Sequence, residues 1–282
     1  MKDASVLVTG GTGYFGKAFV KAALKAGAGR VCVFSRGEFR QAEMRAELGE
    51  DDRVRYFIGD VRDRDRLCRA MEGVCLVVHA AALKRVEVIE YNVLEAVSTN
   101  VIGTENVVKA AIDAKVKKAV LLSSDKAVEP LNAYGITKAL AEKVFLSAKH
   151  YAGANGPKFA ATRYGNVSNS TGSVIPTWRS LLAAGATEVP VTDPECTRFW
   201  MRLEEAVALV MDTAATMQGG ELAIPELPAY RLGDLAEAMG ARMRIVGLRP
   251  GEKMHESMVL GATSEQARRM SVSELREELA RL

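Results

Sequence analysis

The stretch Val6-Leu-Val-Thr-Gly-Gly-Thr-Gly-Tyr-Phe-Gly16 decides the fold of this 282-residue chain. A short β-rich run ends at glycines, and a helical pattern follows from Lys17 to Ala26. The three glycines at 10, 13 and 16 have the spacing G-x-x-G-x-x-G. Between a strand and a helix, such glycines allow a tight turn and let the backbone approach a pyrophosphate at the helix N-terminus. The stretch therefore predicts a dinucleotide site, and the alternative is an incidental glycine turn.

Five more strand-like runs follow, with helical patterns between them. The runs cover residues 31–34, 54–58, 76–80, 119–122 and 159–162, and the longest helical patterns cover 93–114 and 133–149. This alternation predicts an α/β fold, a Rossmann-type doubly wound parallel sheet with helices on both faces. Ligands bind such sheets beyond the C-terminal ends of the strands.

After about residue 166, Gly, Pro and Thr become frequent and the predicted elements become shorter. We expect a nucleotide-binding domain over residues 1–165 and a smaller C-terminal substrate-binding lid over 166–282, with room for the chain to cross back. Helical patterns cover 204–217 and 232–239. The tail carries two capping-box patterns, Thr263-x-x-Gln266 and Ser271-x-x-Glu274, which predict a surface or oligomer-contact helix.

Composition excludes several classes of protein. Hydrophobic residues make up 48% and charged residues 26%, which argues against long disorder. The net charge of +3 is too small to predict a nucleic-acid partner. The longest apolar run, residues 74–83, is about half of a membrane helix, and no signal peptide is expected. The four cysteines lack metal-ligand spacing, so we expect no metal and a reducing, cytoplasmic setting.

The end of the second strand bears on the choice between NADP and NAD. NAD sites usually have an acidic residue about 20 residues after the glycines, which binds the ribose 2′-hydroxyl. This chain has Ser35 and Arg36 there, followed by Arg40. Because a guanidinium suits a 2′-phosphate, the sequence favours NADP. Glu38 is close enough to keep NAD open as the alternative.

Titratable residues gather after the fifth strand. That strand ends in Ser123-Ser124-Asp125-Lys126, and the helix after it begins with Tyr134-Gly-Ile-Thr-Lys138. The spacing Y-x-x-x-K places both side chains on one helical face. A nearby ammonium lowers the pKa of a phenol, which makes the tyrosine a useful base. The alternative is a chance Tyr–Lys pair.

Nine segments of the chain carry a resemblance to known enzymes: Phe57-Ile-Gly-Asp-Val-Arg-Asp63, His79-Ala-Ala-Ala-Leu-Lys84, Glu90-Tyr-Asn92, Thr99-Asn-Val-Ile-Gly103, Ser124-Asp-Lys126, Arg163-Tyr-Gly-Asn-Val167, Gly172-Ser-Val-Ile-Pro176, Thr197-Arg-Phe199 and Arg249-Pro-Gly-Glu-Lys-Met-His-Glu256. With these segments the chain resembles the extended short-chain dehydrogenase/reductases and, within them, the inverting UDP-N-acetylglucosamine 4,6-dehydratases. The glycine and Y-x-x-x-K motifs are typical of the whole superfamily, whereas the Asp-Lys and Arg-Pro-Gly-Glu-Lys segments are far more specific.

The resemblance implies a reaction with internal NADP-mediated hydride transfer. Tyr134, held by Lys138, is expected to take the proton of the 4-hydroxyl. Lys126 is expected to take the carbon-5 proton and Asp125 to protonate the leaving 6-hydroxyl, although these two roles can be exchanged. Related retaining enzymes commonly have Met where this chain has Tyr134, which favours the inverting type.

The resemblance also implies a set of binding residues. The catalytic set is Ser124, Asp125, Lys126, Tyr134 and Lys138. The expected cofactor contacts are Gly10, Thr12, Gly13, Tyr14, Phe15, Gly16, Ser35, Arg36, Arg40, Asp60, Val61, Ala80, Ala81, Ala82, Lys84, Asn100, Tyr134, Lys138 and Tyr164. The expected UDP-sugar contacts are Lys84, Tyr164, Asn166, Val174, Thr192, Arg198, Arg249 and Glu252. Arg198 and Arg249 are the candidates for the diphosphate.

Two other functions stay open at this stage. A UDP-sugar 4-epimerase or 4-ketoreductase would use the same tyrosine and dinucleotide. A non-catalytic NADP-binding sensor would need neither Asp125 nor Lys126. We also expect a homo-oligomer.

Overall fold

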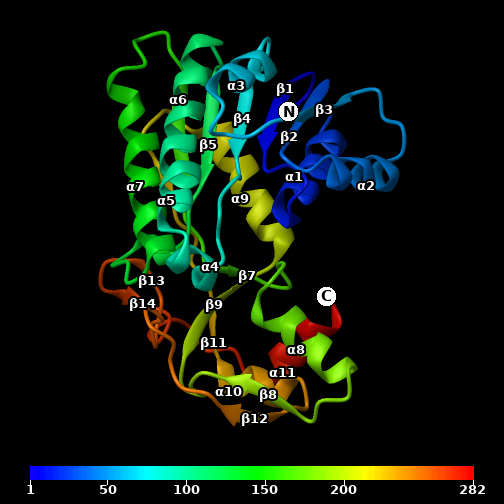
Figure 1. Ribbon diagram of the computed structural model, residues 1–282, viewed down its shortest axis with the longest axis vertical. Helices are drawn as coiled ribbons and strands as arrows, with labels where there is room; N and C mark the ends of the chain where they lie inside the picture. The colour runs from blue at the N-terminus through cyan, green and yellow to red at the C-terminus, as the bar shows by residue number, and fades with distance from the viewer.

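The computed structural model describes residues 1–282 and contains a seven-stranded parallel sheet, with β1 (Ser5–Thr9) inside it (Figure 1). The strand order is β10-β6-β5-β4-β1-β2-β3. The remaining strands of this sheet are β2 (Arg30–Ser35), β3 (Val54–Ile58), β4 (Leu76–His79), β5 (Lys118–Leu122), β6 (Lys158–Thr162) and β10 (Leu222–Ala223). The six predicted strands are therefore present, and the predicted Rossmann-type α/β fold is confirmed.

Alternation along the strands divides the core between the two faces of the sheet. Val6 and Val8 of β1 face one side, where α1 (Tyr14–Lys25), α2 (Glu38–Leu48) and α9 (Leu203–Thr216) pack. Leu7 faces the other side and packs with residues of α3 (Arg64–Met71), α6 (Gly103–Asp113) and α7 (Ala133–Ser147). Because side chains alternate with a period of two, one apolar run supplies both halves of the core.

The helical pattern predicted over 93–114 forms, but with a wider turn inside it. α5 (Val93–Ala96) runs through the π-helical segment η1 (Val97–Ile102) into α6, and the short α4 (Val86–Tyr91) precedes them. The π segment contains Asn100, whose amide donates to the carbonyl of Leu83 at 3.0 Å and accepts from the Leu83 N–H at 2.8 Å. Single π turns inside helices frequently occur at functional sites.

A second lobe lies below the carboxyl edge of the sheet in Figure 1. It contains the three-stranded sheet β11 (Ala229–Arg231), β9 (Thr197–Met201) and β7 (Asn166–Val167), and the pair β8 (Glu188–Val191) and β12 (Arg242–Ile245). Its helices are α8 (Val174–Ala183), α10 (Leu232–Ala238) and α11 (Val272–Ala280), around the buried Trp178 and Leu235. Between the lobes, α9 and β10 return to the first sheet, so residues 203–223 pack with the lobe that contains the seven-stranded sheet.

Of the two capping-box patterns in the tail, only the second begins a helix. Ser271 caps α11 with the predicted reciprocal bonds to Glu274. Thr263 instead ends the hairpin of β13 (Ser257–Val259) and β14 (Ala262–Thr263), and no helix begins at this residue. The Gln266 side chain accepts from the Thr263 N–H at 3.1 Å, which stabilises a turn. No helix in the molecule is both long and apolar enough to cross a membrane.

Candidate active site

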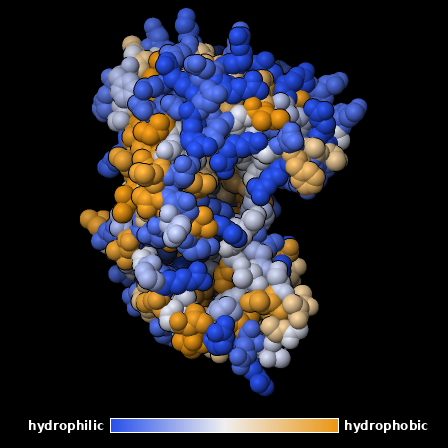
Figure 2. Space-filling view, in the orientation of Figure 1, coloured by the Kyte–Doolittle hydropathy of each residue, from blue (hydrophilic) through white to orange (hydrophobic).

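A cavity of about 1390 Å³ lies between the two lobes. Figure 2 shows the molecule hollowed between the upper and lower halves. The cavity is lined by the glycine turn after β1, the ends of β2, β4 and β5, the start of α7, and loops of the second lobe. Of all the residues expected to contact cofactor or substrate, Asn100 alone is absent from its wall; Asp125, of the catalytic set, is also behind the wall.

The glycine turn has the close packing that a pyrophosphate site requires. Gly10 has φ +66°, and a Cβ there would lie 2.9 Å from the Ala81 Cα. A Cβ on Gly16 would overlap the carbonyl oxygen of Gly10. Gly13 is the N-cap of α1 and makes no side-chain cap, so the first N–H groups of the helix have no capping side chain. These residues fit a dinucleotide pyrophosphate.

The end of β2 presents positive charge at one end of the cavity. Arg36 and Arg40 are exposed on the wall, whereas the Ser35 hydroxyl is buried and accepts from Gln41 at 3.0 Å. Asp60, at the end of β3, pairs with Arg62 at 2.8 Å and lies 3.9 Å from Arg36. Although burial opposes it, the hydrogen bonds from Arg62 lower the pKa of Asp60.

Asn100 supports the wall rather than lining it. Only 1% of it is exposed, and its amide also donates to Thr137 of α7 at 3.1 Å. The amide therefore makes two hydrogen bonds with the Leu83 backbone and one with Thr137 of α7. The Asn100 side chain therefore lies behind the cavity wall, and its contact with the cofactor stays a prediction. Asn100 instead fixes the loop that carries Ala81, Ala82 and Lys84.

The Tyr134–Lys138 pair lies at the start of α7, where Asn132 caps the helix by accepting from the Gly135 N–H at 2.8 Å. Lys138 is buried and donates to the Leu122 carbonyl at 2.6 Å, and burial lowers its pKa to about 8. Burial raises the pKa of the Tyr134 phenol, and Lys126 and Ser124 oppose that shift. The predicted lowering by Lys138 is not seen, because its ammonium points to a strand carbonyl.

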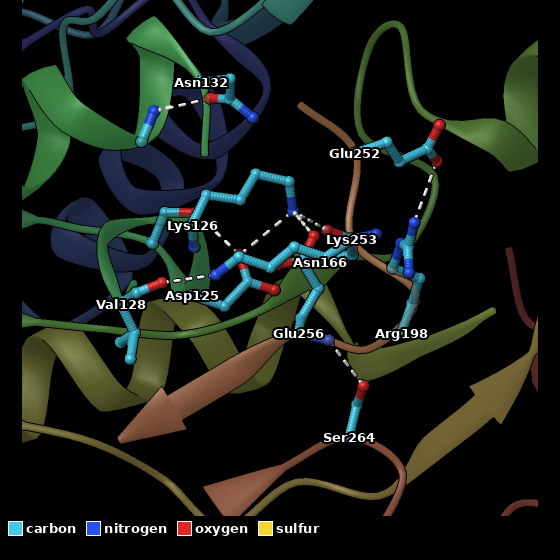
Figure 3. A network of polar contacts seen from close by, with 12 residues as sticks. Asp125, Lys126, Val128, Asn132, Asn166, Arg198, Glu252, Lys253, Glu256 and Ser264 are labelled. Carbon is cyan, nitrogen blue, oxygen red and sulfur yellow. Dashed lines mark hydrogen bonds and ion pairs between the residues drawn. The ribbon is translucent and has the colours of Figure 1, made fainter. Parts of the chain in front are cut away.

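Lys126 is held by two buried carboxylates. Its Nζ lies 3.2 Å from Asp125 Oδ1, 3.0 Å from Glu256 Oε1 and 3.3 Å from Asn166 Oδ1 (Figure 3). Asp125 is fully buried and Glu256 is 3% exposed. Each carboxylate also has one buried oxygen without a hydrogen-bond partner, Asp125 Oδ2 and Glu256 Oε2. The arrangement brings two acids and one ammonium to the end of β5.

Glu256 was missed as a site residue, although it closes the motif Arg249-Pro-Gly-Glu-Lys-Met-His-Glu256. That motif points to the segment, but sequence spacing does not show which of its side chains turns inward. Against the cost of burial, Lys126 and Arg198 lower the pKa of Glu256. Burial raises the pKa of Asp125, and Lys126 opposes that shift only in part.

The expected substrate residues line the second-lobe side of the cavity. Arg198 is 6% exposed and pairs with Glu252 at 2.9 Å, so much of its guanidinium is already bound to protein. Thr192 lies 3.4 Å from the same carboxylate. Arg249 is exposed on the wall, which leaves it the freer guanidinium for a diphosphate. The others on the wall are Lys84, Tyr164, Asn166 and Val174.

Comparison with known proteins shows what this chain is similar to. The family described as "Polysaccharide biosynthesis protein" matches residues 6–275. The inverting UDP-N-acetylglucosamine 4,6-dehydratase of Campylobacter jejuni is 45% identical over 258 residues, 90% of this chain and 77% of that protein. The UDP-glucose 4-epimerase of Rickettsia rickettsii is 40% identical over 267 residues, 91% of this chain and 78% of that protein.

Two solved structures are similar to this chain in fold. The crystal structure of Pen from Bacillus thuringiensis has a TM-score of 0.95 and 36% identity, and covers 100% of this chain and 99% of that one. DesIV from Streptomyces venezuelae, a dTDP-glucose 4,6-dehydratase solved with NAD and TYD bound, has a TM-score of 0.83 and 24% identity, with 98% and 96% covered. The likeness to DesIV shows the fold.

Proposed function

The chain belongs to the family of polysaccharide biosynthesis proteins, and on this premise we propose that it catalyses the inverting 4,6-dehydration of a UDP-N-acetylhexosamine, with UDP-N-acetylglucosamine as the substrate. The product would be a UDP-4-keto-6-deoxy-L-arabino-hexulose. The similarity to the Campylobacter enzyme supports the reaction type. The single observation that carries the proposal is the ion pair of the buried Asp125 with Lys126, near Tyr134, because a 4-epimerase needs no such pair.

The reaction needs three proton transfers, and each is assigned to a different residue. Tyr134 takes the proton of the 4-hydroxyl, with Ser124 against it and Lys138 one turn further along α7. A nicotinamide dinucleotide bound along the glycine turn would accept and return the hydride. The resulting ketone acidifies carbon 5, whose proton Lys126 takes, while Asp125 protonates the leaving 6-hydroxyl. General acid–base groups of this kind contribute about 10² to 10⁴-fold each.

NADP is the proposed dinucleotide. The exposed Arg36 and Arg40 at the end of β2 support it, because a guanidinium binds a 2′-phosphate well. NAD is the alternative, since DesIV was solved with NAD. The UDP-sugar would lie across the second-lobe wall, with Arg249 at its diphosphate.

The test is incubation of the pure protein with UDP-N-acetylglucosamine in deuterium oxide, followed by NMR and mass spectrometry. We expect loss of one water and deuterium at carbon 5. Lys126→Ala should still bind the dinucleotide but form no dehydrated product. Recovery of UDP-N-acetylgalactosamine alone would instead establish the epimerase, which the Rickettsia relative makes the second candidate.

We further propose a homo-oligomer. Exposed apolar side chains on neighbouring helices support it, with Leu94 80% exposed on α5 and Ile136 and Leu140 about half exposed on α7. Figure 2 shows this apolar area on the left of the upper half. Static light scattering of the purified protein checks the assembly, and a monomer at micromolar concentration would contradict it.

A further inference from the structure

Glu256 is a buried carboxylate on the cavity wall that the proposed reaction does not yet use. It comes from the segment before β13, on the second-lobe side, whereas Asp125 and Lys126 come from the end of β5. Two carboxylates share a single ammonium, Lys126 Nζ, at 3.0 and 3.2 Å. A fully ionised trio would carry a net negative charge, and because both carboxylates are almost completely buried, such a charge is unfavourable.

The surroundings decide which carboxylate is charged. Glu256 faces Lys126 of the segment after β5, Arg198 of β9 and Lys253 of its own segment. Asp125 faces Lys126, Glu256 and, from α7 and β11, the uncharged phenols of Tyr134 and Tyr230. Glu256 thus has more positive charge near it, so one proton on the pair belongs on Asp125.

The backbone of Glu256 is fixed as well. Its N–H donates to Ser264 Oγ at 2.9 Å, and Ser264 is completely buried. The same hydroxyl lies 2.6 Å from Thr197 Oγ1, which also contacts His255 Nδ1 at 2.8 Å. The backbone of Glu256 is therefore held beside Lys126, and Figure 3 draws its contacts with Ser264 and Lys126 as dashed lines.

We propose that Glu256 is a positioning residue for dehydration: its carboxylate holds the Lys126 ammonium and leaves Asp125 as the uncharged proton donor. This inference rests on the proposed function. It settles the exchange of roles that the sequence leaves open, because it makes Asp125 the acid.

The proton balance can then be written out. Lys126, which lines the cavity, loses its ammonium proton to solvent, and the free amine takes the proton of carbon 5. The electrons of that C–H bond form the carbon 5–carbon 6 double bond, and the C–O bond at carbon 6 breaks as Asp125 donates its proton, so that water leaves. The hydride would then return from the reduced dinucleotide to carbon 6 while Lys126 returns a proton to carbon 5, which restores the amine. The proton that Tyr134 took from the 4-hydroxyl balances the one that Asp125 lost. Ser124 is hydrogen-bonded to both side chains and lies between them.

The decisive measurement is a titration of Asp125 that does not depend on turnover. Protein labelled with ¹³Cγ-aspartate is followed by NMR from pH 4 upward, with Asp125→Asn to assign the signal. In the wild type, Asp125 should keep its proton to a pH above the ordinary value of about 3.9. In Glu256→Gln it should ionise at a lower pH, since the neighbouring negative charge is gone. An unchanged Asp125 titration in Glu256→Gln would overturn the proposal.

Activity supplies the second readout. Glu256→Gln should lose about 100-fold or more of the dehydration rate at neutral pH, with a rate that recovers as the pH is lowered and Asp125 regains its proton. Oxidation at carbon 4, followed as absorbance of the reduced dinucleotide, should persist. Glu256→Asp keeps the charge and should restore part of the rate. Glu265→Gln, an exposed carboxylate beside His255, is the matched control for both measurements.

The outcomes separate this inference from the proposed function. If the Asp125 titration shifts as expected but the wild type dehydrates no UDP-sugar, the proposed function fails and the charge assignment stands. If the wild type dehydrates and Glu256→Gln keeps the wild-type pH profile, the inference fails alone. Should Glu256→Gln not fold, the Glu256→Asp titration decides, because a carboxylate one methylene further back should shift Asp125 in the same direction by less.

Discussion

At the scale of single residues, Arg36 is where the dinucleotide preference can be tested. Its guanidinium is exposed at the end of β2 and has only a distant ion pair, 3.9 Å from Asp60. Arg36→Ala should therefore weaken NADP binding by about tenfold to a hundredfold, the equivalent of one charge-assisted contact, while NAD binding stays within about twofold. Isothermal titration with both dinucleotides measures the ratio.

A matched variant makes that experiment specific. Arg62→Ala removes a neighbouring arginine that is bound to Asp60 at 2.8 Å and does not line the cavity. It should leave the NADP-to-NAD ratio nearly unchanged. Equal losses for both dinucleotides in Arg36→Ala would show that this arginine does not read the 2′-phosphate.

Some residues of the site could be predicted from the sequence and others could not. Tyr134, Lys138, Asp125 and Lys126 could be picked out because strand ends and helix starts order them along the chain. Glu256 could not, because it meets Lys126 only through a fold that brings residues 130 positions apart together. The direction of the Tyr134 pKa shift also needed the structure, since it depends on burial and on where the Lys138 ammonium points.

At the scale of elements, the junction of β1 and α1 is the part that sequence predicts best. Glycines at 10 and 16 predict that backbone segments approach each other closely there, and the structure has close backbone contacts at both positions. The return of α9 and β10 to the sheet is harder, because a two-residue strand has no periodicity to detect. The π segment around Asn100 is likewise hard to predict, because its side chain forms hydrogen bonds with residues distant in the sequence.

Gly16→Ala tests the close contact of α1 with the turn. A methyl group would overlap the Gly10 carbonyl and lie 2.6 Å from the Gly11 Cα, so backbone must shift. Overpacking of this kind costs about 1 to 3 kcal/mol, and the same shift displaces the N–H groups of the helix start. We expect dinucleotide affinity to fall at least about tenfold, with a lower urea midpoint.

Gly37→Ala is the control for that prediction. Gly37 is the N-cap of α2 at the rim of the same cavity, and the nearest atom to an added Cβ lies 3.9 Å away, an ordinary contact. Its variant should bind and unfold like the wild type. Wild-type affinity in Gly16→Ala, measured by the same titration, would contradict the assignment of this turn to the pyrophosphate.

At the scale of the whole molecule, the two lobes share the site and neither completes it. Tyr134 and Lys126 come from the sheet half, while Arg198, Glu252 and Glu256 come from the other. The chain crosses between the halves more than once, so they cannot be separated by one cut at residue 166 without removing β10 from the sheet. This connectivity predicts that both halves unfold together.

His79 gives that unfolding a pH dependence. It is completely enclosed, and its ring contacts Thr9 of β1 at 2.6 Å and Thr104 of α6 at 3.0 Å, so it ties the sheet to a helix. Burial, with a smaller effect of Lys138, lowers its pKa to about 3. In the unfolded chain a histidine titrates near 6.5, so between these values the unfolded state binds a proton that the folded state excludes.

His79 therefore makes the folded state less stable as the pH falls. The contribution of His79 to stability is complete above pH 6.5 and is lost as the pH falls toward 3, by about 1.4 kcal/mol per unit and on the order of 5 kcal/mol in all. Urea unfolding of the wild type and of His79→Gln from pH 8 to pH 4 measures it. The difference between the two free energies of unfolding should shrink, or reverse, below pH 6.5. His150→Gln, at an exposed histidine, is the control, and a difference that stays constant across the range would refute the prediction.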